Sequence, residues 1–220
     1  MSRIRRLIVL GVVLAVVLIG GAFAAFALRG GDAPPPPTLS DEEAAATATP
    51  AASTTEYEVV QGGDAFVGYR VREEFIGFGF KDAVGRTPDV SGTATIEAGA
   101  IAQADLEADL TTLTSDDGRR DNALRDRGLE SGRYPDARFV LTEPVDLARR
   151  ATAHGRLTLH GETKPTQVRV SAQRIGDDVE LVGSAPIAFA AFGIEPPSVA
   201  GFVTVEDRGT LEFKLRLTPR

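Results

Sequence analysis

Apolar and polar residues alternate in short segments from Tyr57 to the end of the chain. Residues 67–72 (VGYRVR), residues 106–110 (LEADL) and residues 211–218 (LEFKLRLT) show this pattern most clearly. Alternation with a period of two is typical of a strand that buries one face. Roughly eight to ten such segments, with few helix signals, predict an antiparallel sheet that closes into a barrel or folds into a sandwich.

The alternation stops between Leu113 and Phe139, a stretch we call the excursion. The side chains of residues 115–117 (SDD) can accept hydrogen bonds from the first N–H groups of a helix. Gly128 can end a helix by adopting a left-handed conformation. Long connections in compact domains are usually functional loops or lids. The pattern therefore predicts a functional loop or lid that contains a short helical segment.

The N-terminal region has the composition of a membrane anchor. Residues 7–28 are uncharged and largely apolar, and as a helix these 22 residues would reach roughly 33 Å, enough for a bilayer core. Three arginines precede the run and acidic residues follow it, so the positive-inside rule places the globular part outside the cytoplasm. We expect residues 1–29 to form an uncleaved single-pass transmembrane anchor. The alternative is a cleaved signal peptide and a secreted domain.

The next segment, residues 30–56, is rich in Pro, Ala and Thr and has four consecutive prolines. Such a composition lacks the large apolar residues that would offset the entropy of ordering, which predicts a disordered, extended linker. Residues 57–220 then form a single globular domain of about 160 residues, long enough for a substantial core.

Composition excludes several functions. The net charge of −7 argues against a nucleic-acid partner, which would need a basic face. The absence of cysteine excludes disulfides, thiolate metal sites and a cysteine nucleophile. Only His154 and His160 are histidines, and His160 stands at a strand end where a turn-stabilising hydrogen bond is the usual role. No nucleophile elbow, phosphate loop or metal-ligand cluster is present, so we expect no catalytic residue, no metal and no cofactor.

Small residues recur on the presumed inner face of the sheet. They are Ala65, Ala104, Ala108, Ala153, Gly155 and Gly183. Small inward side chains leave room for a ligand cavity, or they fit the taper of a closely packed barrel. Periodicity leaves both interpretations open.

Three blocks, in order, resemble the YceI-like family of exported bacterial polyisoprenoid-binding proteins. The first is residues 64–73 (DAFVGYRVRE), and the second combines residues 120–124 (RDNAL) with residues 134–139 (YPDARF). The third is residues 157–165 (LTLHGETKP). The sequence departs from the family pattern at Asp64, Ala65 and Glu73, where the family often has His, Ser and His.

The resemblance implies an all-β fold, a lipocalin-like antiparallel barrel of eight strands with one short helical excursion. It also implies a long apolar channel for an amphiphilic isoprenoid lipid, such as a quinone or prenyl phosphate. The protein would then be a membrane-tethered carrier or sequestering protein. Ten residues on the inward faces are the expected channel lining: Val67, Tyr69, Val71, Phe78, Leu106, Phe139, Leu157, Leu159, Phe189 and Phe213.

Within the excursion, Arg119 and Arg120 are candidates for contact with a phosphate or carbonyl head group, since guanidinium offers forked donors. The competing interpretation is that Arg120 and Asp121 fix the excursion structurally. Two other functions remain open. One is a ligand-free envelope structural or stress-protection module, and the other is a hydrolase or isomerase that acts on a bound lipid through His160 or a carboxylate. The oligomeric state is not indicated.

Overall fold

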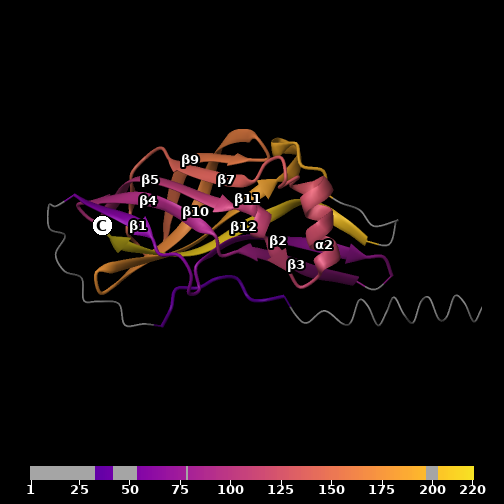
Figure 1. Cartoon of the computed structure of the whole chain (residues 1–220). Coiled ribbons are helices and arrows are strands. Elements are labelled where there is room, and N and C mark those ends of the chain that lie inside the picture. Colours follow the sequence, from indigo (N-terminus) through magenta and orange to yellow (C-terminus); the bar gives the residue numbers. More distant parts are fainter. Residues whose placement is uncertain (1–32, 42–53, 78, 197–202) are drawn as a thin grey trace, which may run out of the picture.

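The computed structural model describes residues 33–41, 54–77, 79–196 and 203–220. Most of this part of the chain is antiparallel β-structure (Figure 1). The strands are β1 (Thr55–Val59), β2 (Phe66–Phe75), β3 (Gly79–Thr87), β4 (Val90–Glu97), β5 (Ala100–Asp109), β6 (Thr114–Ser115), β7 (Asp136–Leu141), β8 (Val145–Asp146), β9 (Ala151–Leu159), β10 (Glu162–Ile175), β11 (Asp178–Ala188) and β12 (Val203–Pro219). The helical segments are η1 (Leu110–Thr112), α2 (Gly118–Ala123), η2 (Leu124–Gly128) and η3 (Phe189–Phe192).

Eight strands close into a barrel in the order β1–β4–β5–β7–β9–β10–β11–β12, and β12 pairs back onto β1. Closure leaves these strands without a free edge along the ring. The prediction of an antiparallel barrel with one short helix is confirmed, and the sandwich alternative is wrong. Within the described ranges no helix is long and apolar enough to cross a bilayer, and the predicted anchor, residues 1–29, lies outside them.

The long strand β12 has two partners on one edge. Its final residues pair with β1, whereas residues 203–214 pair with β2, which carries β3 and then β6 on its far side. The tip of the β2–β3 hairpin lies beside Val203, because Val203 is opposite Phe75. The β10–β11 turn lies at the other end of the barrel, because Val179 is opposite Leu217 (Figure 1).

The core follows from the alternation. Leu215, Leu217 and Val179 are at most 2 % exposed, and their neighbours in sequence face outward. Burying one such side chain contributes about 1.5–3 kcal/mol to folding. One apolar face on each strand is therefore enough to define the inside of the barrel.

The excursion contains the predicted helix, α2, which begins where Asp117 accepts a hydrogen bond from the Arg119 N–H at 2.9 Å. Its end differs from the prediction. Gly128 is not left-handed; instead the last turn widens, with the Leu129 N–H bonded to the Leu124 carbonyl at 2.8 Å. Because this turn contains one extra residue, the left-handed residue that follows the helix is Glu130, with a φ of 46°, and not Gly128.

Residues 33–41, part of the predicted linker, lie against the outer face of the barrel. The Arg70 guanidinium donates to the Pro34 carbonyl at 2.7 Å. The Ser40 N–H donates to the buried carboxylate of Glu180 at 2.8 Å, and Gln173 donates to the Ser40 carbonyl at 3.0 Å. We call this segment the strap.

Candidate functional site

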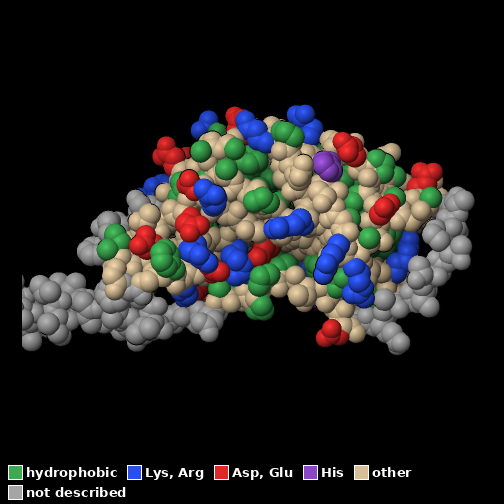
Figure 2. All heavy atoms as spheres, turned by 180° about the vertical axis from the view of Figure 1, so that it is seen from behind, with side chains coloured by type: hydrophobic (Ala, Val, Ile, Leu, Met, Phe, Trp, Pro, Cys, Tyr) green, Lys and Arg blue, Asp and Glu red, His purple; other side chains and the backbone are tan. Residues whose placement is uncertain are grey.

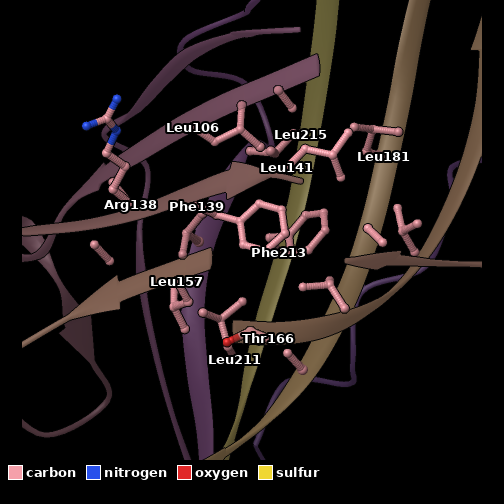
Figure 3. Close-up of a pocket in the computed structure, with 18 of the residues that line it drawn as sticks. Leu106, Arg138, Phe139, Leu141, Leu157, Thr166, Leu181, Leu211, Phe213 and Leu215 are labelled. Atoms are coloured by element: carbon pink, nitrogen blue, oxygen red, sulfur yellow. The ribbon is translucent and has the colours of Figure 1, made fainter. Parts of the chain in front are cut away.

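The barrel encloses a cavity of about 90 Å³. Its wall is built from the inward faces of β5, β7 and β9 to β12, with Val67 of β2 and Val90 of β4. Of the lining residues only Glu107, Arg138 and Thr166 are polar or charged, and Figure 3 shows Arg138 pointing away from the interior. An apolar hydrocarbon is therefore the chemistry that fits inside.

Two phenylalanine rings occupy the middle of this space. Figure 3 shows Phe139 and Phe213 side by side. Each ring lies over a glycine of a neighbouring strand: a Cβ atom at Gly155 would be 2.1 Å from Phe139 Cζ, and one at Gly183 would be 2.3 Å from Phe213 Cζ. The glycines are required because any side chain there would collide with a ring.

Half of the ten predicted lining residues are in the cavity wall: Val67, Leu106, Phe139, Leu157 and Phe213. The remaining described ones are elsewhere. Tyr69 lies against Gly85, with its Cε1 2.4 Å from where a Cβ of that glycine would be, and Phe189 lies over Gly209. Val71 and Leu159 are buried but do not line the cavity. Phe78 lies outside the described residues.

The small inward residues fall into both predicted roles. Ala104, Ala108 and Ala153 line the cavity, whereas Gly155 and Gly183 are covered by rings. Sequence reasoning missed Leu181, Leu211 and Leu215, which also line it. The alternation places each of them on the same face as a predicted neighbour, and that signal was sufficient to include them.

A buried polar cluster lies between β2 and the β6–α2 segment. Glu73, on the inner face of β2, is 7 % exposed and receives two hydrogen bonds from Arg120 of α2, both at 2.9 Å. Arg120 also donates to Asp116 at 2.6 Å and to the Ser115 hydroxyl at 3.2 Å. This bidentate, mostly buried pair fixes α2 to β2.

The electrostatics of the cluster follow from burial and pairing. Burial disfavours the charged guanidinium of Arg120, but hydrogen bonds and attraction from Glu73 outweigh it and raise the pKa of Arg120. Burial acts against ionisation of Asp116 as well, yet the Arg120 and Lys81 charges lower the pKa of Asp116. Burial also raises the pKa of Tyr69, which keeps its hydroxyl protonated.

The two arginines predicted to meet a head group have different surroundings. Arg120 is only 13 % exposed and its donors are taken by Glu73, Asp116 and Ser115. Arg119 is 72 % exposed and pairs with Asp117 at 3.3 Å. Asp121, expected beside Arg120, accepts instead from the Ser115 N–H and hydroxyl, at 3.0 and 2.6 Å.

His160 joins the excursion to η3. Its Nδ1 lies 3.0 Å from the Phe192 carbonyl, and its ring centroid is 4.4 Å from that of Tyr134. The residue has a φ of 52° at the β9–β10 turn and does not line the cavity. Within the described ranges no three His, Cys, Asp or Glu side chains are grouped to hold a metal. This geometry gives His160 a structural role at the turn.

The outside of the barrel contrasts with its interior. Figure 2 shows Lys and Arg side chains interspersed with Asp and Glu across one face. Several outward groups are paired, such as Arg70 with Glu212 at 2.7 Å and Lys214 with Glu180 at 3.2 Å. The face shown in Figure 2 is therefore a mixed-charge surface.

Comparison with known proteins agrees with this architecture. A UPF0312 protein of Vibrio parahaemolyticus is 28% identical over 156 residues, which cover 66% of this chain and 80% of the relative. One from Photorhabdus laumondii is 27% identical over 137 residues, covering 61% of this chain and 68% of the relative.

Among solved structures, a polyisoprenoid binding domain from Saccharophagus degradans, implicated in plant cell wall breakdown, has a TM-score of 0.59 at 18% identity, covering 74% of this chain and 98% of that one. BcnA of Burkholderia cenocepacia has a TM-score of 0.55 at 18% identity, with 68% and 95% covered. At this identity the two structures establish the fold. The model of the YceI-like domain matches residues 52–217, and the chain therefore belongs to the YceI-like family.

Proposed function

We propose that this protein binds the hydrocarbon chain of an isoprenoid lipid inside the barrel, outside the cytoplasm, while its N-terminal segment holds it at the membrane. The observation that carries the proposal is the apolar cavity inside the barrel, whose wall offers almost no polar group. Support also comes from the fold, which is shared with a domain described as polyisoprenoid-binding. The family is one of binding proteins, and the function proposed is carriage or sequestration.

The energetics suit such a ligand. A chain that buries about 300 Å² of apolar surface gains about 7 kcal/mol before the costs of association. The cavity of about 90 Å³ is smaller than one of about 150 Å³ that holds a benzene molecule. Loading therefore requires the rings of Phe139 and Phe213 to leave their places over Gly155 and Gly183.

A variant that fills the cavity tests this proposal. Ala104 lines the cavity on β5, whereas its neighbour Gln103 is exposed on the outer face of the same strand. Ala104→Leu should reduce binding of a short prenyl alcohol at least tenfold, and Gln103→Leu should leave it unchanged. Binding is measured by native mass spectrometry and by titration of the purified full chain in detergent. Equal binding by the two variants would refute a site inside the barrel.

One observation favours a second function, that of a ligand-free structural module: the free space left in the cavity is only about 90 Å³. Organic extraction of protein purified from membranes separates the two functions. A co-purifying lipid with an isoprenoid tail supports carriage. Protein that carries no lipid and binds none on titration supports the structural module.

A further inference from the structure

The tip of the β2–β3 hairpin carries exposed apolar side chains. Ile76 is 53 % exposed and Phe80 is 66 % exposed, and no other large hydrophobic side chain in the described ranges is exposed. Single exposed apolar residues are common on protein surfaces. Here both are four residues apart on one hairpin, in which Phe75 pairs with Gly79 and Glu74 with Phe80.

The described part of the chain leaves the turn of this hairpin uncovered. A Cβ atom built at Gly77 or Gly79 would meet nothing within 4 Å, so no described part of the chain packs against either position. Their φ values of 83° and 108° are accessible mainly to glycine, which lets the hairpin turn tightly without side chains at these positions. The result is a convex projection at the end of the barrel that also carries α2 (Figure 1).

The charges just behind the tip cancel. Arg72 and Lys81 are balanced by Glu74 and Asp82. Arg72 pairs with Asp82 at 3.7 Å, and its guanidinium carbon lies 6.0 Å from the centre of the Phe80 ring. Lys81 pairs with Asp116 at 3.3 Å. Attraction to an anionic partner is therefore weak, and the apolar side chains must supply the binding energy.

The size and shape of the tip decide what it binds. A phenylalanine side chain buries about 150–250 Å², so two side chains fall well below the roughly 800 Å² that each partner gives to a stable protein interface. A convex apolar tip needs no complementary surface in order to enter a lipid bilayer, where binding scales with the apolar area inserted.

We propose that Ile76 and Phe80 insert into the surface of a phospholipid bilayer and dock this end of the barrel on the membrane. Arg72 then lies at the depth of the head groups while the Phe80 ring enters the acyl region. The inference deepens the proposed function, on which its biological meaning rests, because docking brings the barrel to the phase where isoprenoid lipids dissolve.

The chain contains no tryptophan, so a single introduced tryptophan reports on its own position. Phe80→Trp in the full chain, reconstituted into phosphatidylcholine vesicles without isoprenoid, should show blue-shifted emission and quenching by brominated acyl chains. Adding Ile76→Ser to this variant should lower its affinity for the vesicle surface roughly fivefold. Quenching should persist at an ionic strength of about 1 M, where charge interactions are screened within about 3 Å.

The matched control is Asp177→Trp, placed in the β10–β11 turn at the other end of the barrel, which should remain quenched by aqueous iodide. Equal lipid quenching at both positions, or none at position 80, would overturn the proposal. A blue shift that appears without vesicles and grows with protein concentration would assign the tip to self-association and also overturn it. Because the vesicles lack isoprenoid, failure here leaves the Ala104→Leu test of the proposed function untouched.

Discussion

The apolar cavity and the polar cluster are two buried regions of the same domain, but they are held in place by different forces. Around Phe139 and Phe213 the contacts are dispersive and tolerate displacement, because no donor or acceptor is left unpaired when a ring moves. Around Glu73 and Arg120 the contacts are directional, and separating the pair leaves a buried charge without a partner. The comparison teaches that displacing a ring costs less free energy than separating the buried ion pair.

The largest loss of stability should follow from breaking the ion pair between Glu73 and Arg120. Arg120→Ala leaves Glu73 buried and unpaired, and we expect a loss of about 3–5 kcal/mol in the free energy of unfolding. Urea denaturation followed by circular dichroism measures it. Arg119→Ala is the matched control, because this exposed pair contributes at most about 1 kcal/mol. Similar losses for the two variants would contradict the comparison.

A smaller loss should follow from enlarging the cavity. Phe213→Ala removes a ring that already borders free space and therefore has fewer packing contacts to lose. We expect the free energy of unfolding to fall by about 3 kcal/mol, the low end for a Phe→Ala change in a core. The same variant should bind a prenyl alcohol more tightly, since only the Phe139 ring then has to be displaced. Calorimetric titration beside urea denaturation checks both. Weaker binding would mean that the Phe213 ring is a contact for the ligand and not an obstacle.

The cap of α2 offers a more modest perturbation. Asp117→Ala removes the acceptor for the Arg119 N–H and should cost about 1 kcal/mol. Since the cavity does not touch α2, the affinity for a prenyl alcohol should not change. A change in affinity would show that the polar cluster and the cavity are energetically coupled, and would contradict their description as independent regions.

The smallest effect should come from pH. The pKa of Asp116 is lowered in the folded state, so its contribution to stability is complete above its ordinary value of 3.8 and is lost as pH falls below it. Asp116→Asn should therefore flatten the dependence of Tm on pH in this acid range. Phe213→Ala should keep the slope of the unmodified protein, because it changes no ionisable group. Thermal scans at several pH values provide the comparison.

Much of the fold could be predicted from sequence, because the alternation of apolar and polar residues within each strand indicates which of its faces is buried. Leu211, Phe213 and Leu215 illustrate this: alternation alone places them on one face. The helix start at Asp117 is equally local, since capping depends on residues within one turn. The helix end was mispredicted because Gly128 stands where the backbone widens, a feature set by packing beyond the turn itself.

The candidate site was less predictable because its contacts join distant segments. Alternation places Glu73 on the face of Val67 and Val71, yet only the folded chain brings Arg120 to it, 47 residues later. Phe139 and Gly155 likewise meet only through the pairing of β7 with β9. Composition also gave no sign of the strap, whose order depends on Arg70 and Glu180 rather than on its own side chains.

The strap would shorten the connection between the barrel and the anchor predicted from the sequence. The predicted linker of residues 30–56, fully extended, would allow about 90 Å between anchor and domain. With Pro34 held by Arg70, only residues 30–33 separate the predicted anchor from Pro34, a span of at most about 18 Å. With the predicted anchor in a bilayer, a span this short would keep the barrel close to that bilayer, and exchange with a distant membrane would require the strap to detach first.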